Sequence, residues 1–318
     1  MTAIVSQPPL DLGPLQETAD KAKTYMLAAK SDNTRRAYAA DWSDFTAWCA
    51  DHGTTALPAH ADTVTLYLTD LADRCKTGTV QRRVTAIRQA HAGHDDPTDS
   101  RQVREVMKGI RRTRGTVKEG RAPAVIEDIR RMVAALDGTN MGTRNRAILL
   151  IGFAGAFRRS ELVALDVQHI RFSRDGLVVR LRRSKTDQEG KGTEKAIPYG
   201  SNPDTCPVRA LQAWVVKAKI TTGPLFREIR RGDHIQERRL SDRAIALVVK
   251  RCAQAAGLNP DQYSGHSLRA GFATTAGEKG VEERDIQRQT GHKSVQVLRG
   301  TIRHGSLFKR NAAAQVGL

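Results

Sequence analysis

The change of hydrophobic period after Leu165 constrains the fold of this chain more than any other feature. Before it, apolar side chains recur at the three- and four-residue spacing of helices. From residue 167 to 198 the pattern (VQHIRFSRDGLVVRLRRSKTDQEGKGTEKAIP) instead predicts three short antiparallel strands. Asp175-Gly176 predicts the turn of the first hairpin, and the polar run 186–192 predicts the tip of the second. One small sheet within a helical chain predicts a fold that is mainly α, with a three-stranded antiparallel sheet.

Helical periodicity accounts for most of the remaining sequence. The segment TRNRAILLIGFAGAF, residues 143–157, is almost entirely apolar, so we expect it at the centre of its domain. Ser31 is a favourable N-cap for a helix that ends near His52. Helices are predicted at 15–29, 31–52, 62–74, 79–91 and 100–112, and then at 125–136, 143–157, 207–217, 241–256 and 267–279, with two or three short helices at the end.

The chain is long enough for two domains, and a linker between them can be recognised. Residues 114–124 (RGTVKEGRAPA) are basic, contain glycine and proline, and have few apolar side chains. We therefore expect a flexible N-terminus over 1–14, a helical domain over 15–113, the basic linker over 114–124 and a second domain over 125–318.

The charge of the chain indicates a polyanionic partner. Lys and Arg total 52 against 34 Asp and Glu, which gives a formal net charge of +18. Many arginines occur in pairs and runs, and aromatic residues make up only 5% of the chain. Few aromatic side chains argue against stacking on single-stranded bases, so double-stranded DNA gripped by its phosphates is the predicted partner. The candidate contacts are Arg35, Arg36, Arg82, Arg83, Arg111, Arg112, Arg114, Lys118, Arg121, Arg159, Arg182, Arg183, Arg238 and Arg239.

Several other classes of protein are disfavoured. No stretch approaches the ~20 apolar residues that span a bilayer, and the opening MTAIVSQPPLDLG lacks the features of a secretory signal. The four cysteines form no CxxC pair, and the histidines form no HExxH motif. We therefore expect an intracellular protein with no membrane association, no metal and no cofactor.

Three short motifs carry the chemistry. The first is FRRSEL at 157–162, where the apolar helix meets a polar turn. The second is SGHSLR at 264–269, in which His266 and Arg269 are three residues apart at the start of a helix. The third is Gly291-His292 and the residues that follow it. Each motif alone is weak, because a charged helix end or an HxxR pair arises by chance, but their order and spacing together are specific.

The whole arrangement resembles the tyrosine recombinase (phage integrase) family over nearly the full chain. The resemblance implies a two-domain DNA clamp, with a helical core-binding (SAM-like) domain and a catalytic domain. The activity implied is site-specific DNA cutting and rejoining through a 3′-phosphotyrosyl intermediate, without metal or cofactor. The positions that match the catalytic residues of the family are Arg158, Lys185 on the second hairpin, His266, Arg269 and His292.

Their residue types suit phosphoryl transfer. The guanidinium groups of Arg158 and Arg269 can hold the equatorial oxygens of a phosphodiester by paired hydrogen bonds, and His292 can add a donor. Lys185 could protonate the departing 5′ oxygen, and His266 could accept the proton of the nucleophile. Singly, each has a plain structural explanation, such as a helix cap, an exposed loop lysine or a buried histidine.

The position of the nucleophile departs from the family pattern. It falls nine residues after His292, at Thr301, where the family has tyrosine. All five tyrosines of the chain lie upstream of His292, and Tyr263 is expected to pack against the helix that follows it. Three explanations are open: deliberate replacement of the nucleophile, a naturally degenerate recombinase kept as a regulator, or a threonine nucleophile. We favour the first, because the other five positions are intact, and we expect binding and assembly without cleavage.

Other readings of the function remain open as well. One is a natural non-catalytic DNA-binding regulator on the same fold, and another is a type IB topoisomerase-like enzyme. A metal-dependent nuclease is disfavoured because no carboxylate cluster is evident. The resemblance implies a dimer on each DNA site, a tetramer in the synapse, and a bacterial or phage-encoded protein of the cytoplasm and nucleoid. The tail 306–318 is expected to form a short helix, docked either on a neighbouring protomer or on its own domain.

Overall fold

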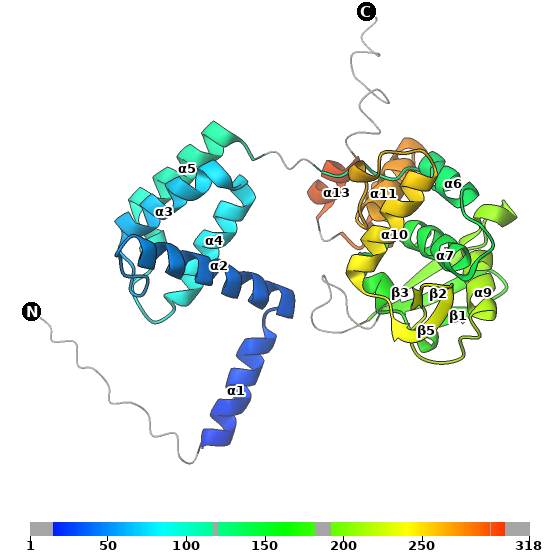
Figure 1. Cartoon of the computed structure of the whole chain (residues 1–318), viewed down its shortest axis with the longest axis horizontal. Coiled ribbons are helices and arrows are strands. Elements are labelled where there is room, and N and C mark those ends of the chain that lie inside the picture. Colours follow the sequence, from blue (N-terminus) through cyan, green and yellow to red (C-terminus); the bar gives the residue numbers. More distant parts are fainter. Residues whose placement is uncertain (1–14, 117–119, 182–191, 293, 303–318) are drawn as a thin grey trace, which may run out of the picture. The chain divides into compact units, whose positions relative to one another are not determined.

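The computed structural model describes residues 15–116, 120–181, 192–292 and 294–302. The chain divides into two compact units, with the boundary between residues 119 and 120 (Figure 1). The first unit contains the helices α1 (Gln16–Ala28), α2 (Asp32–Asp51), α3 (Ala61–Arg74), α4 (Thr77–Ala90) and α5 (Arg101–Arg114).

The second unit is also largely helical and contains the sheet. Its elements are α6 (Ile126–Ala134), α7 (Asn140–Ala154), α8 (Arg159–Val163), β1 (Ile170–Phe172), β2 (Gly176–Leu181), β3 (Thr193–Pro198), α9 (Pro207–Lys217), β4 (Arg227–Arg230), β5 (His234–Arg239), α10 (Asp242–Ala255), α11 (Ser267–Glu278), α12 (Glu283–Thr290) and α13 (Val295–Ile302). This composition confirms the predicted fold class, mainly α with a three-stranded antiparallel sheet.

The first unit is built on the apolar stripes of its helices. Ser31 caps α2 by accepting a hydrogen bond from the Thr34 backbone N–H, as its sequence predicts. Phe45 of α2 and Leu68 of α3 are fully buried, and Ile87 of α4 completes the same core. Burial of each such side chain contributes about 1.5–3 kcal/mol, so the stripes account for the packing of these helices.

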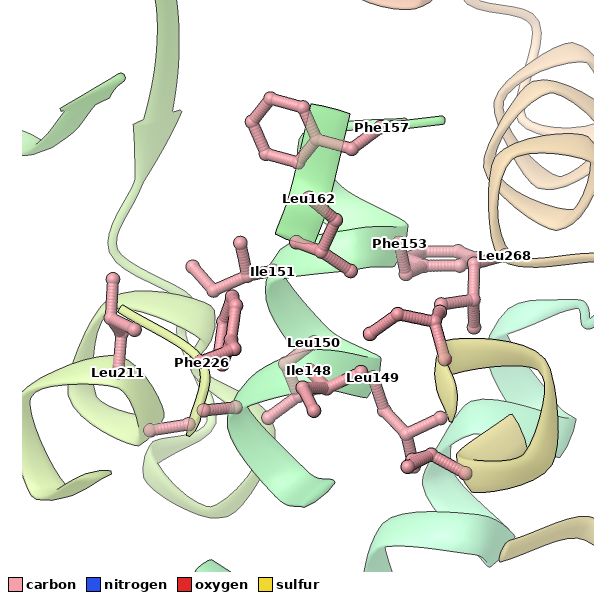
Figure 2. Close-up of a cluster of buried hydrophobic side chains, with 14 of the residues drawn as sticks. Ile148, Leu149, Leu150, Ile151, Phe153, Phe157, Leu162, Leu211, Phe226 and Leu268 are labelled. Atoms are coloured by element: carbon pink, nitrogen blue, oxygen red, sulfur yellow. The ribbon is translucent and has the colours of Figure 1, made fainter. Parts of the chain in front are cut away.

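The second unit is organised around α7, whose side chains are buried along almost its whole length. Figure 2 shows Leu211 of α9 and Phe226 on one side of α7, and Leu268 of α11 on the other. All three of these side chains belong to one apolar cluster with Ile148 and Ile151 of α7. The prediction that this helix lies at the centre of its domain is confirmed.

The helix α7 has the predicted length but lies three residues earlier in the chain, because it begins at Asn140 and ends at Ala154 rather than at residue 157. Ala156 adopts a left-handed backbone conformation with φ of 46°, which a continuing helix cannot contain. Gly155 precedes it at a position where an added Cβ would overlap the ring of Phe157. The turn 155–157 therefore redirects the chain and places Arg158 at the N-cap of α8.

The predicted sheet is present, with strand order β1-β2-β3 and antiparallel pairing throughout. Phe172 pairs with Leu177 around the predicted turn, and Val179 pairs with Lys195 in the centre of the second hairpin. The residues 182–191 at the tip of that hairpin lie outside the described part of the chain.

A second, two-stranded sheet formed by β4 and β5 was not predicted. Its strands (REIR and HIQERR) carry charged and polar side chains on both faces, so they lack the apolar alternation that marks a half-buried strand. Gly232 and Asp233 both have positive φ, at 83° and 64°, and form the tight turn between the strands.

The start of α11 is held against the segment that enters the second unit. The Ala124 N–H donates to the Ser267 carbonyl at 2.9 Å, and Ala124 is fully buried. An added Cβ on Gly271 would overlap the Ala124 carbonyl, so only glycine allows this approach. These contacts fix the helix that carries Arg269. Within the described ranges, none of the helices has the length and apolar character needed to cross a membrane.

Candidate active site

Arg158 stands at the N-cap of α8 and is held by Glu161 of the same helix. Its Nη1 pairs with Glu161 Oε1 at 2.5 Å, and Glu161 Oε2 accepts the Arg158 backbone N–H at 2.9 Å. The carboxylate is buried, with a side chain 3% exposed, whereas the Arg158 side chain keeps 20% of its surface open. This reciprocal pair leaves the guanidinium oriented and partly accessible.

Arg269, on the first turn of α11, is 1% exposed. Its Nη1 donates to the Ala156 carbonyl at 2.8 Å, while its Nη2 is buried and has no hydrogen-bond partner among the described residues. Burial, and then the charge of Arg158, lower the pKa of Arg269 to about 10, and Glu161 opposes this shift. A buried guanidinium N–H without an acceptor costs free energy, which an incoming anion would recover.

His292 follows the end of α12, where Gly291 adopts the left-handed conformation, φ 64°. The Gly291 carbonyl accepts from Arg158 Nη2 at 3.3 Å, so this turn lies beside the first arginine. Burial lowers the pKa of His292 to about 4, with further contributions from the charges of Arg269, Arg158, His266 and Lys195. The ring is therefore neutral at pH 7.

The tautomer of His292 follows from its neighbour Thr290. The Thr290 hydroxyl donates to the Ile286 carbonyl at 2.7 Å, and His292 Nδ1 lies 2.8 Å from the same hydroxyl oxygen. Because the hydroxyl proton is engaged by the carbonyl, Nδ1–H is the donor of the second bond. Nε2 is left without a proton in the neutral ring, and it gains one only when the ring is protonated.

His266 is the N-cap residue of α11 and reaches the surface. Desolvation by the surrounding protein, and then the charges of Arg269, Arg158 and Arg159, lower the pKa of its ring below the ordinary value. This environment of three arginines favours the neutral form of the ring, which can act as a base.

Lys195 was missed by sequence reasoning, although it lies in the same group. It is 6% exposed, and burial lowers its pKa to about 8, with Arg269 and Arg158 adding to the shift and Glu161 opposing it. A signal was present in the sequence, because Lys195 shares the inward-facing register of β3 with Ile197. A charged residue in an inward position is unusual enough to be noticed.

The structure brings together four of the predicted site residues, Arg158, His266, Arg269 and His292. Lys185 lies outside the described residues. Thr301 is on α13, where its hydroxyl donates to the Val297 carbonyl at 3.1 Å and its carbonyl accepts from Thr274 of α11 at 3.4 Å. Tyr263 is buried in the core of the second unit, and its hydroxyl donates to Asp128 of α6 at 3.1 Å.

Three of the predicted DNA-contact arginines make internal ion pairs or hydrogen bonds. Arg83 has a side chain only 13% exposed and pairs with Asp44, while Arg82 donates to the buried Asp41 carboxylate at 2.6 and 2.9 Å. Arg239 donates to the Val163 carbonyl at 2.6 Å and pairs with Asp166.

Arg82 is nevertheless exposed, and so are the other candidates in the described ranges. Arg35 pairs with Asp32, Arg36 donates to Asn33, and Arg114 pairs with Asp73 at 3.1 Å. Arg121 donates to the Asp261 carbonyl, and Arg238 lies 3.8 Å from Glu228. The remaining exposed candidates are Arg111, Arg112 and Arg159. Lys118, Arg182 and Arg183 lie outside the described residues.

The arrangement is suited to an anion with several oxygens. Among the described residues, Arg158, Arg269 and Lys195 lie near the buried carboxylate of Glu161. The imidazoles of His266 and His292 lie near the two guanidinium groups. The pKa values of Lys195, Arg269 and His292 are all displaced toward the uncharged form. Burial is the largest cause of each displacement and the charges of neighbouring cations add to it, so a bound anion would favour the charged forms.

Comparison with known proteins places this chain in a family. Residues 126–301 match the model of the phage integrase family. An integrase/recombinase XerD homolog from Selenomonas ruminantium is 43% identical over 298 residues, which cover 92% of this chain and 87% of that protein. A tyrosine recombinase XerD from Caulobacter vibrioides is 28% identical, covering 84% of each chain.

Solved structures show the same fold at low sequence identity. A post-cleavage complex of the XerH site-specific recombinase with difH DNA aligns with a TM-score of 0.61 at 14% identity, covering 80% of this chain and 72% of the other. A λ integrase dimer bound to a core site aligns with a TM-score of 0.58 at 18% identity, covering 91% and 77%. With a family match over more than half its length and a relative 43% identical across nearly all of it, this chain belongs to the phage integrase family of tyrosine recombinases.

Proposed function

We propose that this protein binds double-stranded DNA at a specific site and holds one phosphodiester between Arg158 and Arg269, but is deficient in cleavage. The observation that carries the proposal is the buried Arg269 Nη2, which has no acceptor among the described residues. Arg269 lies near the cation of Arg158 and the buried carboxylate of Glu161, which already pairs with Arg158. A phosphodiester supplies the missing acceptor and the missing charge together.

The division of labour follows from the chemistry of each group. Arg158 and Arg269 bind the two non-bridging oxygens and stabilise the charge that develops when a nucleophile attacks. The phosphodiester raises the pKa of His292 by its charge, so that the ring takes up a proton and Nε2–H becomes a third donor. His266 is unprotonated at neutral pH and suits the role of base toward the nucleophile. Lys185 is proposed as the acid for the 5′ oxygen.

Deficiency in cleavage rests on the chemistry of Thr301. Its alcohol sits beside Cβ and already donates to the Val297 carbonyl within its own helix. A tyrosine would carry its hydroxyl several ångström further, and phenol, with a pKa of about 10, is far more acidic than a secondary alcohol. Threonine therefore has neither the reach nor the acidity of the residue that the family uses.

The assembly is also proposed from the family. Residues 15–113 would act as the core-binding domain and 125–318 as the catalytic domain, closing on the duplex as a clamp. Two protomers would occupy one site and four would form the synapse. The solved λ integrase relative is a dimer bound to a core site.

Replacement of Thr301 by tyrosine tests the proposal. DNase footprinting on the flanking DNA first locates the binding site, and a duplex nicked near the cleavage position then traps the covalent intermediate. We expect Thr301→Tyr to form a protein–DNA adduct on a denaturing gel, at a rate at least about a thousandfold above that of the unaltered chain. Thr301→Phe is the matched control, since it restores the ring without the hydroxyl.

Each result has a clear meaning. An adduct formed by the unaltered chain as readily as by Thr301→Tyr would show that Thr301 is a working nucleophile. Specific DNA binding without any adduct from Thr301→Tyr would favour a natural regulator built on the same fold. Relaxation of supercoiled DNA by Thr301→Tyr without sequence preference would favour the topoisomerase-like reading.

A further inference from the structure

Lys195 is a buried ammonium that the proposed chemistry leaves unused. It lies on β3 beside the fully buried core, and its Nζ is 4.9 Å from the centre of the Phe157 ring. Its hydrogen-bond acceptors are two main-chain carbonyls, Gly155 O at 2.7 Å and Gln289 O at 2.5 Å. Neither acceptor is a carboxylate, so the ammonium is buried without a salt bridge to Asp or Glu among the described residues.

The two acceptors lie in the two turns that deliver the site. Gly155 is the first residue of the turn 155–157, which leads directly to Arg158. In the same turn, the Ala156 carbonyl accepts a hydrogen bond from Arg269. Gln289 lies at the end of α12, three residues before His292. The two turns are joined again by Gln289 Nε2, which donates to the Ala154 carbonyl at 2.8 Å. One side chain on β3 thus bridges segments that are more than 130 residues apart in sequence.

Folding stability does not explain why a lysine occupies position 195 on β3. Burial disfavours its charged form, and the nearby charges of Arg158 and Arg269 disfavour it further. A methionine would fill a similar volume with no charge to bury, and replacement of buried charges by apolar side chains is often neutral or stabilising. The feature that methionine lacks is the pair of hydrogen bonds to the two turns.

We propose that Lys195 is a positioning residue, whose ammonium holds the turn before Arg158 against the end of α12 so that Arg158, Arg269 and His292 are in place before DNA binds. Preorganised donors stabilise a transition state because they do not need to reorganise during the reaction. The inference rests on the proposed function in so far as these three groups bind the phosphodiester.

The first experiment needs no cleavage. Amide hydrogen exchange is measured by mass spectrometry on the unaltered full chain, on Lys195→Met and on Glu194→Gln. Glu194 is the matched control, because it is adjacent on β3 and exposed. We expect Lys195→Met to speed exchange at least tenfold in peptides covering 155–161 and 286–292, with no change in peptides of the first unit. Unchanged exchange in both turns would overturn the proposal.

The second experiment separates chemistry from binding in the Thr301→Tyr background. We expect Lys195→Met to leave the DNA dissociation constant within about twofold and to slow adduct formation at saturating protein at least tenfold. An unchanged rate of adduct formation would overturn the proposal. A fall in DNA affinity and melting temperature in parallel with the rate would also overturn it, because Lys195 would then contribute only to packing. If Lys195→Met does not fold, Lys195→Gln, which keeps an N–H donor on a side chain one atom shorter, is measured in the same two ways.

The outcome of each experiment can be interpreted independently of the other. If the Thr301→Tyr parent forms no adduct, the proposed function is contradicted, and hydrogen exchange still decides whether Lys195 orders the two turns.

Discussion

At the scale of single residues, the site is a set of cations with too little negative charge among them. Glu161 is the carboxylate that pairs with Arg158, while Arg269 and Lys195 donate to main-chain carbonyls instead. Burial, and then the charges of neighbouring cations, lower the pKa values of Lys195 and Arg269, and carbonyl oxygens accept their hydrogen bonds without neutralising charge. In the proposed function, the same imbalance that costs free energy in the free protein would favour binding of a phosphodiester.

His292 provides a prediction at this scale. Its folded-state pKa of about 4 lies below the unfolded value of about 6.5, so the unfolded chain takes up the proton first as the pH falls. The stability contributed is fully present above pH 6.5 and is lost as the pH falls toward 4, by about 1–3 kcal/mol after allowance for the partial exposure of the ring. Urea unfolding at pH 7 and pH 4.5, followed by the fluorescence of Trp214 with Trp42 and Trp48 replaced by Phe, measures this loss.

His292→Gln should lose less stability over the same pH interval. If the parent and His292→Gln lose the same unfolding free energy between pH 7 and pH 4.5, the folded protein does not lower the pKa of His292. Addition of duplex DNA should raise the midpoint of the His292 NMR titration, because the phosphate charge favours the imidazolium.

At the scale of elements, the site is assembled where helices begin and end rather than along their lengths. Arg158 begins α8, Arg269 lies in the first turn of α11, and His292 follows α12. Helix termini carry backbone groups without intrahelical partners, and side chains there can turn toward a common point. The left-handed Ala156 contributes to the same end, because the turn it makes presents a carbonyl to Arg269.

Gly271 provides the prediction at this scale. A Cβ there would overlap the Ala124 carbonyl, which is main chain and cannot move aside as a side chain can. Gly271→Ala should therefore lower the unfolding free energy of the second unit by about 2–4 kcal/mol, despite the better helix propensity of alanine. Gly109→Ala, in α5 with open space around it, should instead stabilise the first unit by up to about 1 kcal/mol. Thermal unfolding of both variants tests the contrast, and a neutral Gly271→Ala would contradict the close approach.

At the scale of the whole molecule, the surplus of basic residues is divided between structure and surface. Arg82, Arg83 and Arg239 belong to internal ion pairs. Arg111 and Arg112 are exposed near the end of α5, close to the boundary between the two units. The total of 52 Lys and Arg therefore overstates the number of cations that are available to DNA phosphates.

Salt dependence of DNA binding provides the prediction at this scale. Each phosphate contact contributes about 0.9 to the slope of log affinity against log salt. The double variant Arg111→Gln, Arg112→Gln should weaken binding and lower this slope by about 1–2, as measured by fluorescence anisotropy across salt concentrations. The charge-matched control is Lys21→Gln, Lys23→Gln, whose lysines already pair with Glu17 and Asp20. Equal effects of the two double variants would point to net charge rather than to local contacts.

Local pattern was sufficient for most of the elements, the fold class and four of the gathered site residues. Periodicity of 3.6 or 2 residues reports which face of an element is apolar, so the bounds of a helix such as α9 could be predicted, and the strand β2 could be placed after its turn. Where that signal is missing, as in the charged strands β4 and β5, the prediction failed. The motifs around Arg158, Arg269 and His292 were found because their spacing matches a known family.

Long-range packing alone decided the remaining features. The end of α7 at Ala154 depends on a left-handed residue whose carbonyl serves a side chain 113 residues away. The place of Lys195 depends on carbonyls 40 and 94 residues away, and the burial of Arg83 depends on carboxylates on another helix. Hydrophobic period records only whether a side chain faces inward, whereas hydrogen bonds and desolvation depend on which atoms the folded chain brings to it.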